Sequence, residues 1–216
     1  IKVTNNIFEG NYSGDVNAFK GEGATISYNE CDNRIVNLFA KESVVSFNKM
    51  RYNDTLHVVV PDRVAITSTS AIVNNEGTTE EIVQSNKVIG NIIHGYPVGM
   101  DLRGKSLTAN SNDIYDVTEV GIKFSGIRDS WIKDNYIESD SIVNAFSSSN
   151  NFIENVSIEG NKIRVPNGVA FNLDAVNGST QINRFYIRNN KDVVAQTMLK
   201  NRGNSYGLVY DGNKGN

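Results

Sequence analysis

Two stretches of this sequence share one phrase: Ile132-Lys133-Asp134-Asn135-Tyr136-Ile137 and, 26 residues later, Ile158-Glu159-Gly160-Asn161-Lys162-Ile163. In each stretch an apolar residue precedes a turn-forming residue and an Asn, and a second apolar residue lies two places after the Asn. Asn, Asp and Gly tolerate left-handed backbone angles, so the centre of the phrase is typical of a sharp turn between two short strands. A recurring strand–turn–strand unit indicates a repeat protein.

The phrase recurs along the chain, centred on Asn6, Asn29, Asn48, Asn86, Asn112, Asn135, Asn161, Asn190 and Asn213. Neighbouring copies are 19 to 29 residues apart, except for one interval of 38 residues between Asn48 and Asn86. The midpoint of that interval is Thr67, which predicts a copy with Thr in place of Asn and about ten coils in all. We expect the Asn side chains of successive coils to lie on one edge and to hydrogen-bond as a ladder.

The rest of each repeat predicts strands rather than helices. A leucine-rich repeat has a similar period, but no apolar stripe with helical spacing fills the remainder, and Ile, Val and Phe dominate over Leu. A second apolar segment follows most of the Asn positions, for example Gly99–Leu102, Gly121–Phe124 and Gly168–Phe171. These patterns predict an all-β fold, a single-stranded right-handed parallel β-helix, with residues 1–216 as one domain.

The Ile-x-x-Asn-x-Ile phrase, the Asn ladder and the Gly-x-x-Phe second strand resemble the pectin-lyase-like superfold, the right-handed β-helix of pectate lyases, polygalacturonases and phage tailspikes. The resemblance covers nearly the whole chain. The Asp-Asp and Gly-His-Gly motifs of polygalacturonases and the Trp-x-Asp-His motif of pectate lyases are absent. The compact, Asn- and Ser-rich coils look most like the body of a tailspike or appendage protein. This implies a polysaccharide partner and an extracellular location or a place on a virion tail. Uncapped solenoid ends and surface aromatic residues such as Trp131 suggest covered surfaces, so we also expect the parent protein to be a homotrimer.

Two functions stay open. The first is a polysaccharide-binding or polysaccharide-degrading domain of a tailspike or secreted surface protein, with hydrolase and lyase chemistry as the enzymatic options. The second is a non-catalytic structural or adhesive shaft that binds glycan or partner chains. The absence of any predicted coil longer than about 29 residues argues against loops that wall a catalytic groove. Because the first copy starts at Val3 without a polar cap, we also expect a fragment of a larger protein.

We expect the functional residues on the face of the second strands, where polar side chains recur on adjacent coils. On this face the candidate catalytic residues are Asp101 and Lys123, and the candidate substrate-binding residues are Arg103, Ser125, Ser147 and Asn172. Asp129, in a turn column, is a further catalytic candidate, and Trp131, in another outward column, is a further substrate-binding candidate. Arg103 has no acid in its column and is predicted to be free to bind a carboxylate or hydroxyls. A lyase would use Lys123 or Arg103 as a base, whereas a glycosidase needs a second carboxyl group about 5–9.5 Å away. A simple ion pair between Asp101 and Lys123 is the competing interpretation.

A different column carries charges that alternate in sign. Lys133, Glu159, Arg188 and Asp211 all lie two residues before an Asn, and they predict a ladder of exposed ion pairs that fixes the register. Glu138 and Arg164 predict a similar pair. Trp131 and Tyr186 share an outward column two coils apart, where aromatic rings could stack on sugars or pack under a partner.

Composition argues against several other functions. The net charge of −3 and the lack of a basic run disfavour nucleic acid and anionic membranes as partners. Cys31 is the single cysteine, so neither an internal disulfide nor a cysteine-based metal site is possible. The two histidines, His57 and His94, share no predicted column, which argues against a zinc site or a catalytic triad. No metal and no cofactor are expected.

Overall fold

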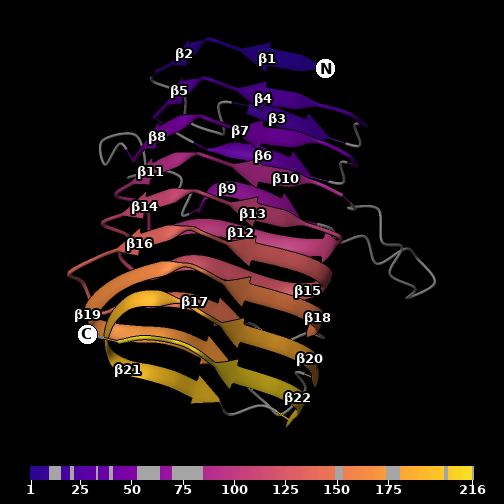
Figure 1. Ribbon diagram of the computed structural model, residues 1–216. Coiled ribbons are helices and arrows are strands. Elements are labelled where there is room, and N and C mark those ends of the chain that lie inside the picture. Colours follow the sequence, from indigo (N-terminus) through magenta and orange to yellow (C-terminus); the bar gives the residue numbers. More distant parts are fainter. Residues whose placement is uncertain are drawn as a thin grey trace.

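The computed structural model describes residues 1–9, 16–19, 22–32, 34–38, 41–52, 64–69, 85–148, 153–173, 181–201 and 204–215. These residues contain 22 strands and no helix, and the pairings between their strands are parallel. Figure 1 shows the strands stacked in coils from the N-terminus at one end to the C-terminus at the other. The chain is therefore an all-β, right-handed parallel β-helix, as the sequence predicts.

Each coil crosses three sheets in turn. Sheet 1 contains β1 (Lys2–Thr4), β4 (Thr25–Ser27), β7 (Val44–Ser46), β10 (Lys87–Ile89), β13 (Thr108–Asn110), the second half of β15 (Val120–Lys133), β18 (Ile153–Glu159), β20 (Gln181–Arg188) and β22 (Asn204–Asp211). Sheet 2 contains β2 (Ile7–Phe8), β5 (Glu30–Cys31), β8 (Lys49–Arg51), β11 (Ile92–His94), β14 (Asp113–Tyr115), β16 (Tyr136–Glu138) and the first parts of β19 (Lys162–Leu173) and β21 (Lys191–Asn201). Sheet 3 contains β3 (Val16–Phe19), β6 (Ile35–Leu38), β9 (Val64–Thr69), β12 (Val98–Lys105), the first half of β15, β17 (Asn144–Ser148) and the remaining parts of β19 and β21.

The core fills the space between the three sheets. Side chains alternate between the interior and the surface along each strand, so the middle residues of the sheet 2 strands, such as Ile93, Ile114 and Ile137, are fully buried. Sheet 3 adds aromatic stacks, in which the rings of Phe146 and Phe171 lie 5.4 Å apart at an angle of 7°. The apolar residue two places after the ladder Asn therefore belongs to the core on these coils.

An asparagine ladder closes the corner between sheets 1 and 2. Its nine members in the described chain are Asn6, Asn29, Asn48, Asn91, Asn112, Asn135, Asn161, Asn190 and Asn213. The Nδ2 group of each donates to the Oδ1 atom of the next, over 2.7 to 3.0 Å. The same Oδ1 atom also accepts the backbone N–H of the preceding ladder Asn, for example Asn112 N–H to Asn135 Oδ1 at 3.0 Å.

The prediction placed Asn86 and Thr67 in this ladder, and both placements are wrong. Asn48 donates to Asn91, 43 residues away, so this coil is longer than the 29 residues expected. Asn86 lies at another corner, where its Oδ1 accepts the Ser43 N–H at 2.9 Å. Thr67 lies in β9, within sheet 3, opposite Asp101. Val88-Ile89-Gly90-Asn91-Ile92-Ile93 matches the phrase as well as the Asn86 copy does, and hydrogen bonding selects Asn91.

The residue before each ladder Asn has a left-handed backbone. These residues are Asn5, Tyr28, Phe47, Gly90, Ser111, Asp134, Gly160, Asn189 and Gly212, with φ between 51° and 70°. Gly, Asn and Asp accept this conformation readily, whereas it costs other residues about 1–2 kcal/mol because Cβ approaches the carbonyl oxygen. Tyr28 and Phe47 are the two bulky exceptions in this column.

None of the described segments forms a helix of the length and apolar character needed to cross a lipid bilayer.

Candidate functional site

The predicted polar strip lies on sheet 3. Asp101, Lys123, Ser147 and Asn172 occupy the same register position on β12, β15, β17 and β19, so these four residues are neighbours on successive coils as expected. The carboxylate of Asp101 is nearly buried, with 10% of its side chain exposed. Asn172 has a buried Oδ1 atom with no hydrogen-bond partner among the described residues. The four residues therefore form a strip as predicted, but the nearly buried Asp101 carboxylate contributes little exposed polar surface to it.

Two members of the strip differ from the prediction. Arg103 is not free, because its Nη2 and Nε atoms donate to the two carboxylate oxygens of Asp101 at 2.9 and 3.3 Å. The prediction compared residues between coils and overlooked a partner two residues away on the same strand. Ser125 points inward and is fully buried. The register shifts between Leu102 and Gly104, and this bend turns two consecutive residues, Phe124 and Ser125, into the core.

The other two predicted residues lie away from this strip. Asp129 follows Lys123 by six residues, and its left-handed backbone places it at the next corner, where Asn155 Nδ2 donates to its Oδ1 atom at 2.8 Å. Trp131 lies on sheet 1 and is 44% exposed. It shares a column with Ser157 and Tyr186, as predicted. The structure thus keeps Asp101 and Lys123 together and separates both from Asp129. Asp174, a further carboxylate near this sheet in sequence, and His57 lie outside the described residues.

The charged ladder on sheet 1 has the predicted register. Lys133 lies opposite Glu159, Glu159 opposite Arg188, and Arg188 opposite Asp211. Lys133 Nζ and Glu159 Oε2 are 3.3 Å apart. This hydrogen bond is the main reason why the pKa of Glu159 lies below its ordinary value, with a smaller contribution from Asn189.

We expect Glu159→Ala to lower the free energy of unfolding by less than about 1 kcal/mol at neutral pH, because exposed ion pairs contribute little. The lowered pKa means that the stabilisation by Glu159 is present above the ordinary pKa of a glutamate and disappears as the pH falls below it. Urea unfolding of both proteins at pH 7 and pH 3 measures this. A larger difference at pH 3 than at pH 7 would contradict it.

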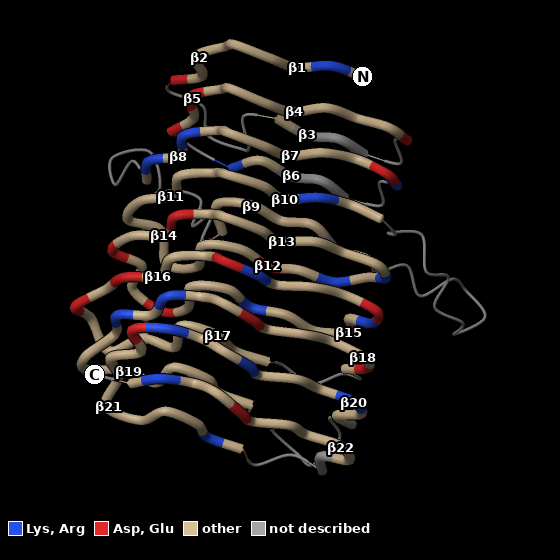
Figure 2. The backbone as a smooth tube through the Cα atoms, viewed as in Figure 1, with Lys and Arg blue, Asp and Glu red and all other residues tan. Residues whose placement is uncertain are grey.

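The most prominent polar arrangement lies on sheet 2. The third residue after each ladder Asn points outward, which places Arg51, His94, Tyr115, Glu138 and Arg164 opposite one another on five successive coils. We call these five residues the polar row. Coils are spaced by about 4.8 Å, so the row extends over about 19 Å. Acidic and basic segments follow one another along this edge in Figure 2.

At the C-terminal end of the row, Glu138 is held from two sides. The phenol of Tyr136 donates to Glu138 Oε2 at 2.8 Å, and Arg164 Nε lies 3.1 Å from Glu138 Oε1. Burial and the hydrogen bond to Glu138 raise the pKa of Tyr136 to about 12. Tyr136 therefore stays protonated at neutral pH and acts as a hydrogen-bond donor, and Glu138 keeps a fixed orientation.

Two aromatic rings lie near the middle of the row: that of Tyr115, a member of the row, and that of Tyr136, which lies beside the row, two residues before Glu138 on β16. Tyr115 and Tyr136 meet edge to face, with ring centroids 5.6 Å apart. Burial, followed by the charges of Asp113 and Glu138, raises the pKa of Tyr115. Burial also raises the pKa of Asp113, which lies opposite Tyr136 on the neighbouring coil. The row thus combines half-buried aromatic rings with phenol donors and carboxylates.

A histidine and a carboxylate lie next to these tyrosines. His94 Nε2 is 3.0 Å from Asp116 Oδ2, and both side chains are more than half exposed. His94 lies directly opposite Tyr115. A carboxylate in contact with one nitrogen of an imidazole fixes the orientation of the ring, and proton transfer requires an oriented ring.

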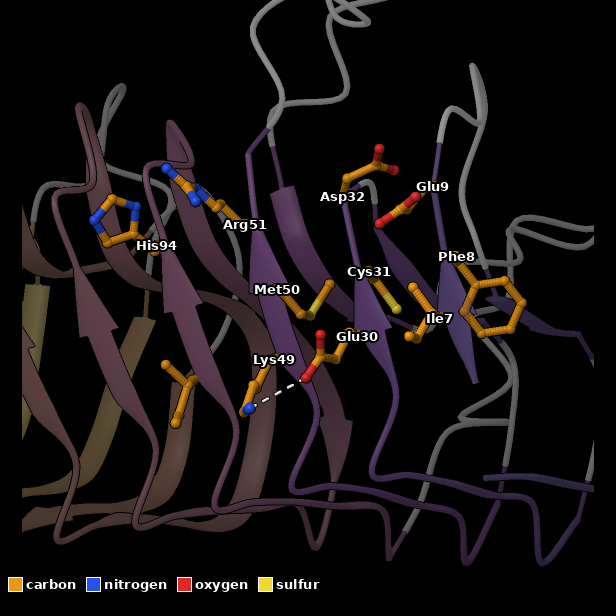
Figure 3. A pocket seen from close by; sticks show the side chains of 11 residues that line it. Ile7, Phe8, Glu9, Glu30, Cys31, Asp32, Lys49, Met50, Arg51 and His94 are labelled. Carbon is orange, nitrogen blue, oxygen red and sulfur yellow. Dashed lines mark hydrogen bonds and ion pairs between the residues drawn. The ribbon is translucent and has the colours of Figure 1, made fainter. Parts of the chain in front are cut away.

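The row leads into a depression on the N-terminal coils. It has a volume of about 390 Å³ and is lined by Ile7, Phe8, Glu9, Glu30, Cys31, Asp32, Lys49, Met50, Arg51, Ile92 and His94. Figure 3 shows Glu30 and Lys49 meeting at one side of it, with Arg51 and His94 at the other. Glu30 and Lys49 form an exposed ion pair of 3.1 Å, whereas Arg51 has no ion-pair partner in the part of the chain that the structure describes.

Metal binding is a separate question. Among the described residues, no three His, Cys, Asp or Glu side chains gather as ligands of one ion.

Sequence patterns revealed only one pair of the polar row, Glu138–Arg164. The signal of the whole row is readable, because every member follows a ladder Asn by three residues. Placing Asn86 in the ladder hid His94, which is three residues after Asn91, and so this histidine was assigned no column.

Comparison with known proteins shows one partial sequence relative and two structures with a similar backbone. No protein-family model matches the chain. The uncharacterized protein YclG of Bacillus subtilis (strain 168) is 31% identical over 122 residues, which are 56% of this chain and 20% of that protein. The chain thus spans about a fifth of the length of that relative.

Two solved structures have a similar backbone. The surface protein and adhesin PfbA of Streptococcus pneumoniae has a TM-score of 0.43 at 10% identity, covering 88% of this chain and 67% of that one. The A-module of the mannuronan C-5 epimerase AlgE6 of Azotobacter vinelandii has a TM-score of 0.45 at 11% identity, covering 90% of this chain and 58% of that one. At these identities the likeness concerns the course of the backbone and no side chain.

Proposed function

We propose that this β-helix binds a polysaccharide along the polar row of sheet 2. The observation that carries the proposal is the row itself, in which five outward polar or aromatic side chains follow one another on consecutive coils and lead into a depression. A regularly spaced, straight strip matches an extended polymer, which repeats the same chemical groups along its length. A single compact ligand would occupy only part of a strip of about 19 Å.

The residue types suit sugars. A pyranose ring has apolar C–H faces, which pack on aromatic rings such as those of Tyr115 and Tyr136, and a hydroxyl rim, which bonds to charged groups. Glu138 and Arg164 are already ordered by each other, so little side-chain entropy is lost when they bind. Arg51, at the other end of the row, offers a guanidinium to hydroxyls or to a carboxylate.

Arg164→Ala should weaken binding about tenfold, equivalent to about 1.4 kcal/mol, because it removes a donor and releases Glu138. The matched control is Lys133→Ala, which removes the basic partner of another partly exposed ion pair, on sheet 1, and should leave binding unchanged. Calorimetric titration with polygalacturonate, alginate and dextran measures both variants. Equal loss in the two variants, or no binding of any of these polymers by the unaltered protein, would refute the proposal.

A second candidate function is cleavage of the bound polymer, and the pair His94–Asp116 favours it. In a β-elimination the imidazole of His94 would accept the proton on C5 of a uronate residue, and the glycosidic bond at C4 would break to leave a C4–C5 double bond. The phenol of Tyr115, which lies beside His94, would give its proton to the leaving oxygen. A fall in polymer mass that His94→Ala abolishes would support cleavage. Binding without any change in mass would support the alternative, an adhesive or structural shaft.

The setting of the domain is also part of the proposal. We propose that it belongs to a larger extracellular or virion-borne surface protein, such as a tailspike, and that this parent is a homotrimer. The sheet 3 strip with Asp101, Lys123, Ser147 and Asn172 is a second proposed contact for the glycan. Sedimentation of the intact parent tests the trimer, and a monomer at micromolar concentration would contradict it.

A further inference from the structure

Tyr28 and Phe47 form an exposed aromatic pair at the ladder corner of two neighbouring coils. Their ring centroids are 5.2 Å apart and their planes differ by 16°. The exposed fractions are 59% for Tyr28 and 48% for Phe47, so a large part of each ring is in contact with solvent, while the Phe47 ring also lies against Gly90 on the next coil. No other position of the left-handed column carries a side chain of this size.

This pair is unfavourable for the isolated chain. Both residues have positive φ, 57° and 54°, a conformation in which a bulky side chain is strained. Seven of the nine positions in the column use Asn, Asp, Ser or Gly instead, so the turn does not need an aromatic residue. Strained residues with exposed apolar side chains are typical of sites that contact a ligand.

The surroundings of the pair indicate the chemical class of this ligand. Ile7 and Ile92, which are 69% and 41% exposed, lie on the adjoining strands of sheet 2. Between them in the same column are Glu30 and Lys49, each two residues after one of the aromatic residues. The interior of a protein–protein interface is depleted of Lys and Glu, whereas a sugar needs both apolar surface and charged hydrogen-bonding groups.

We propose that Tyr28 and Phe47, together with the ion pair Glu30–Lys49, form a subsite that binds a sugar ring by stacking. The apolar face of a pyranose packs against the aromatic pair, and its hydroxyls bond to Glu30 and Lys49 at the border of the depression. The subsite extends the polar row toward the N-terminal coils, because Lys49 and Arg51 line the same depression. This inference rests on the proposed function and deepens it. Stacking on the aromatic pair does not need a charged group on the sugar, so the subsite should also bind neutral sugars.

The test exchanges the aromatic residues for types that the same column already contains. The double variant Tyr28→Asn, Phe47→Gly should keep or raise the melting temperature, because it relieves two strained backbones. It should weaken binding of cellohexaose, maltohexaose and polygalacturonate about tenfold in calorimetric titration. Tyr206→Thr, which removes an exposed aromatic residue from β22 on sheet 1, is the matched control and should bind as the unaltered protein does.

The outcomes separate this subsite from the polar row. If Arg164→Ala binds normally and the double variant does not, the row proposal fails and the subsite stands. If the double variant binds every probe normally, or has a lower melting temperature with unchanged binding, the aromatic pair is structural and the inference is wrong. It is equally wrong if the unaltered protein binds none of these probes, or if the double variant abolishes self-association without affecting sugar binding.

Discussion

Asn135→Ala is expected to lower the free energy of unfolding by about 4 kcal/mol, because several buried polar groups lose their partners at once. Asn135 is 1% exposed. Its Oδ1 atom accepts the backbone N–H and the Nδ2 group of Asn112 at 3.0 and 2.9 Å. Its Nδ2 group donates to Asn161 Oδ1 at 2.9 Å and to the Ala109 carbonyl at 3.1 Å. Alanine satisfies none of these groups.

The control for this prediction is Asn110→Ala on the preceding coil. The side chain of Asn110 is partly exposed and accepts one bond from Ser111 Oγ, at 3.3 Å. Its removal should change the free energy of unfolding by no more than about 0.5 kcal/mol. Urea unfolding followed by circular dichroism measures both variants. Similar midpoints for the two would show that the ladder contributes little to stability.

Gly121→Ala is expected to cost about 3 kcal/mol, for a steric reason. A Cβ atom at this position would lie 2.7 Å from the Ala145 carbonyl oxygen and 2.8 Å from Ile137 Cγ2. The carbonyl belongs to the backbone of the next coil, so the two coils would have to move apart. Gly99 meets the same obstacle one coil earlier, at 2.5 Å from the Gly121 carbonyl oxygen. The Gly of the Gly-x-x-Phe phrase is therefore needed because consecutive coils approach closely at this position.

Gly23→Ala separates this steric effect from backbone strain. Gly23 has a φ of 62°, and no atom among the described residues lies within 4 Å of the position that an alanine methyl group would occupy. Strain alone should cost about 1 kcal/mol there. Thermal unfolding of both variants is the measurement, and a loss at Gly23 as large as that at Gly121 would rule out the steric explanation.

Much of the fold could be predicted because its signals are local. The phrase around Asn135 and Asn161 specifies a strand, a turn and a strand within six residues, and copies of it must stack to bury their apolar side chains. The alternation of charge in Lys133, Glu159 and Arg188 was readable for the same reason, since residues at equal distance from a ladder Asn meet on adjacent coils. These features follow from spacing along the chain.

The functional face could not be predicted in the same way. Asn86 and Asn91 fit the phrase equally well, and the hydrogen bond from Asn48 to Asn91 selects one of them, which in turn brings His94 beside Tyr115. Ser125 points inward because of a register shift between two coils. Arg103 is bound to Asp101 because of the side-chain conformation of Asp101. The pattern of residues in the chain was enough for the coils and their interior columns. Only the tertiary structure decided which of two equivalent turns joins the ladder, where the strands bend and which side chains pair. The turns and bends depend on contacts between segments that are distant in sequence, and the pairs depend on side-chain rotamers that no periodicity encodes.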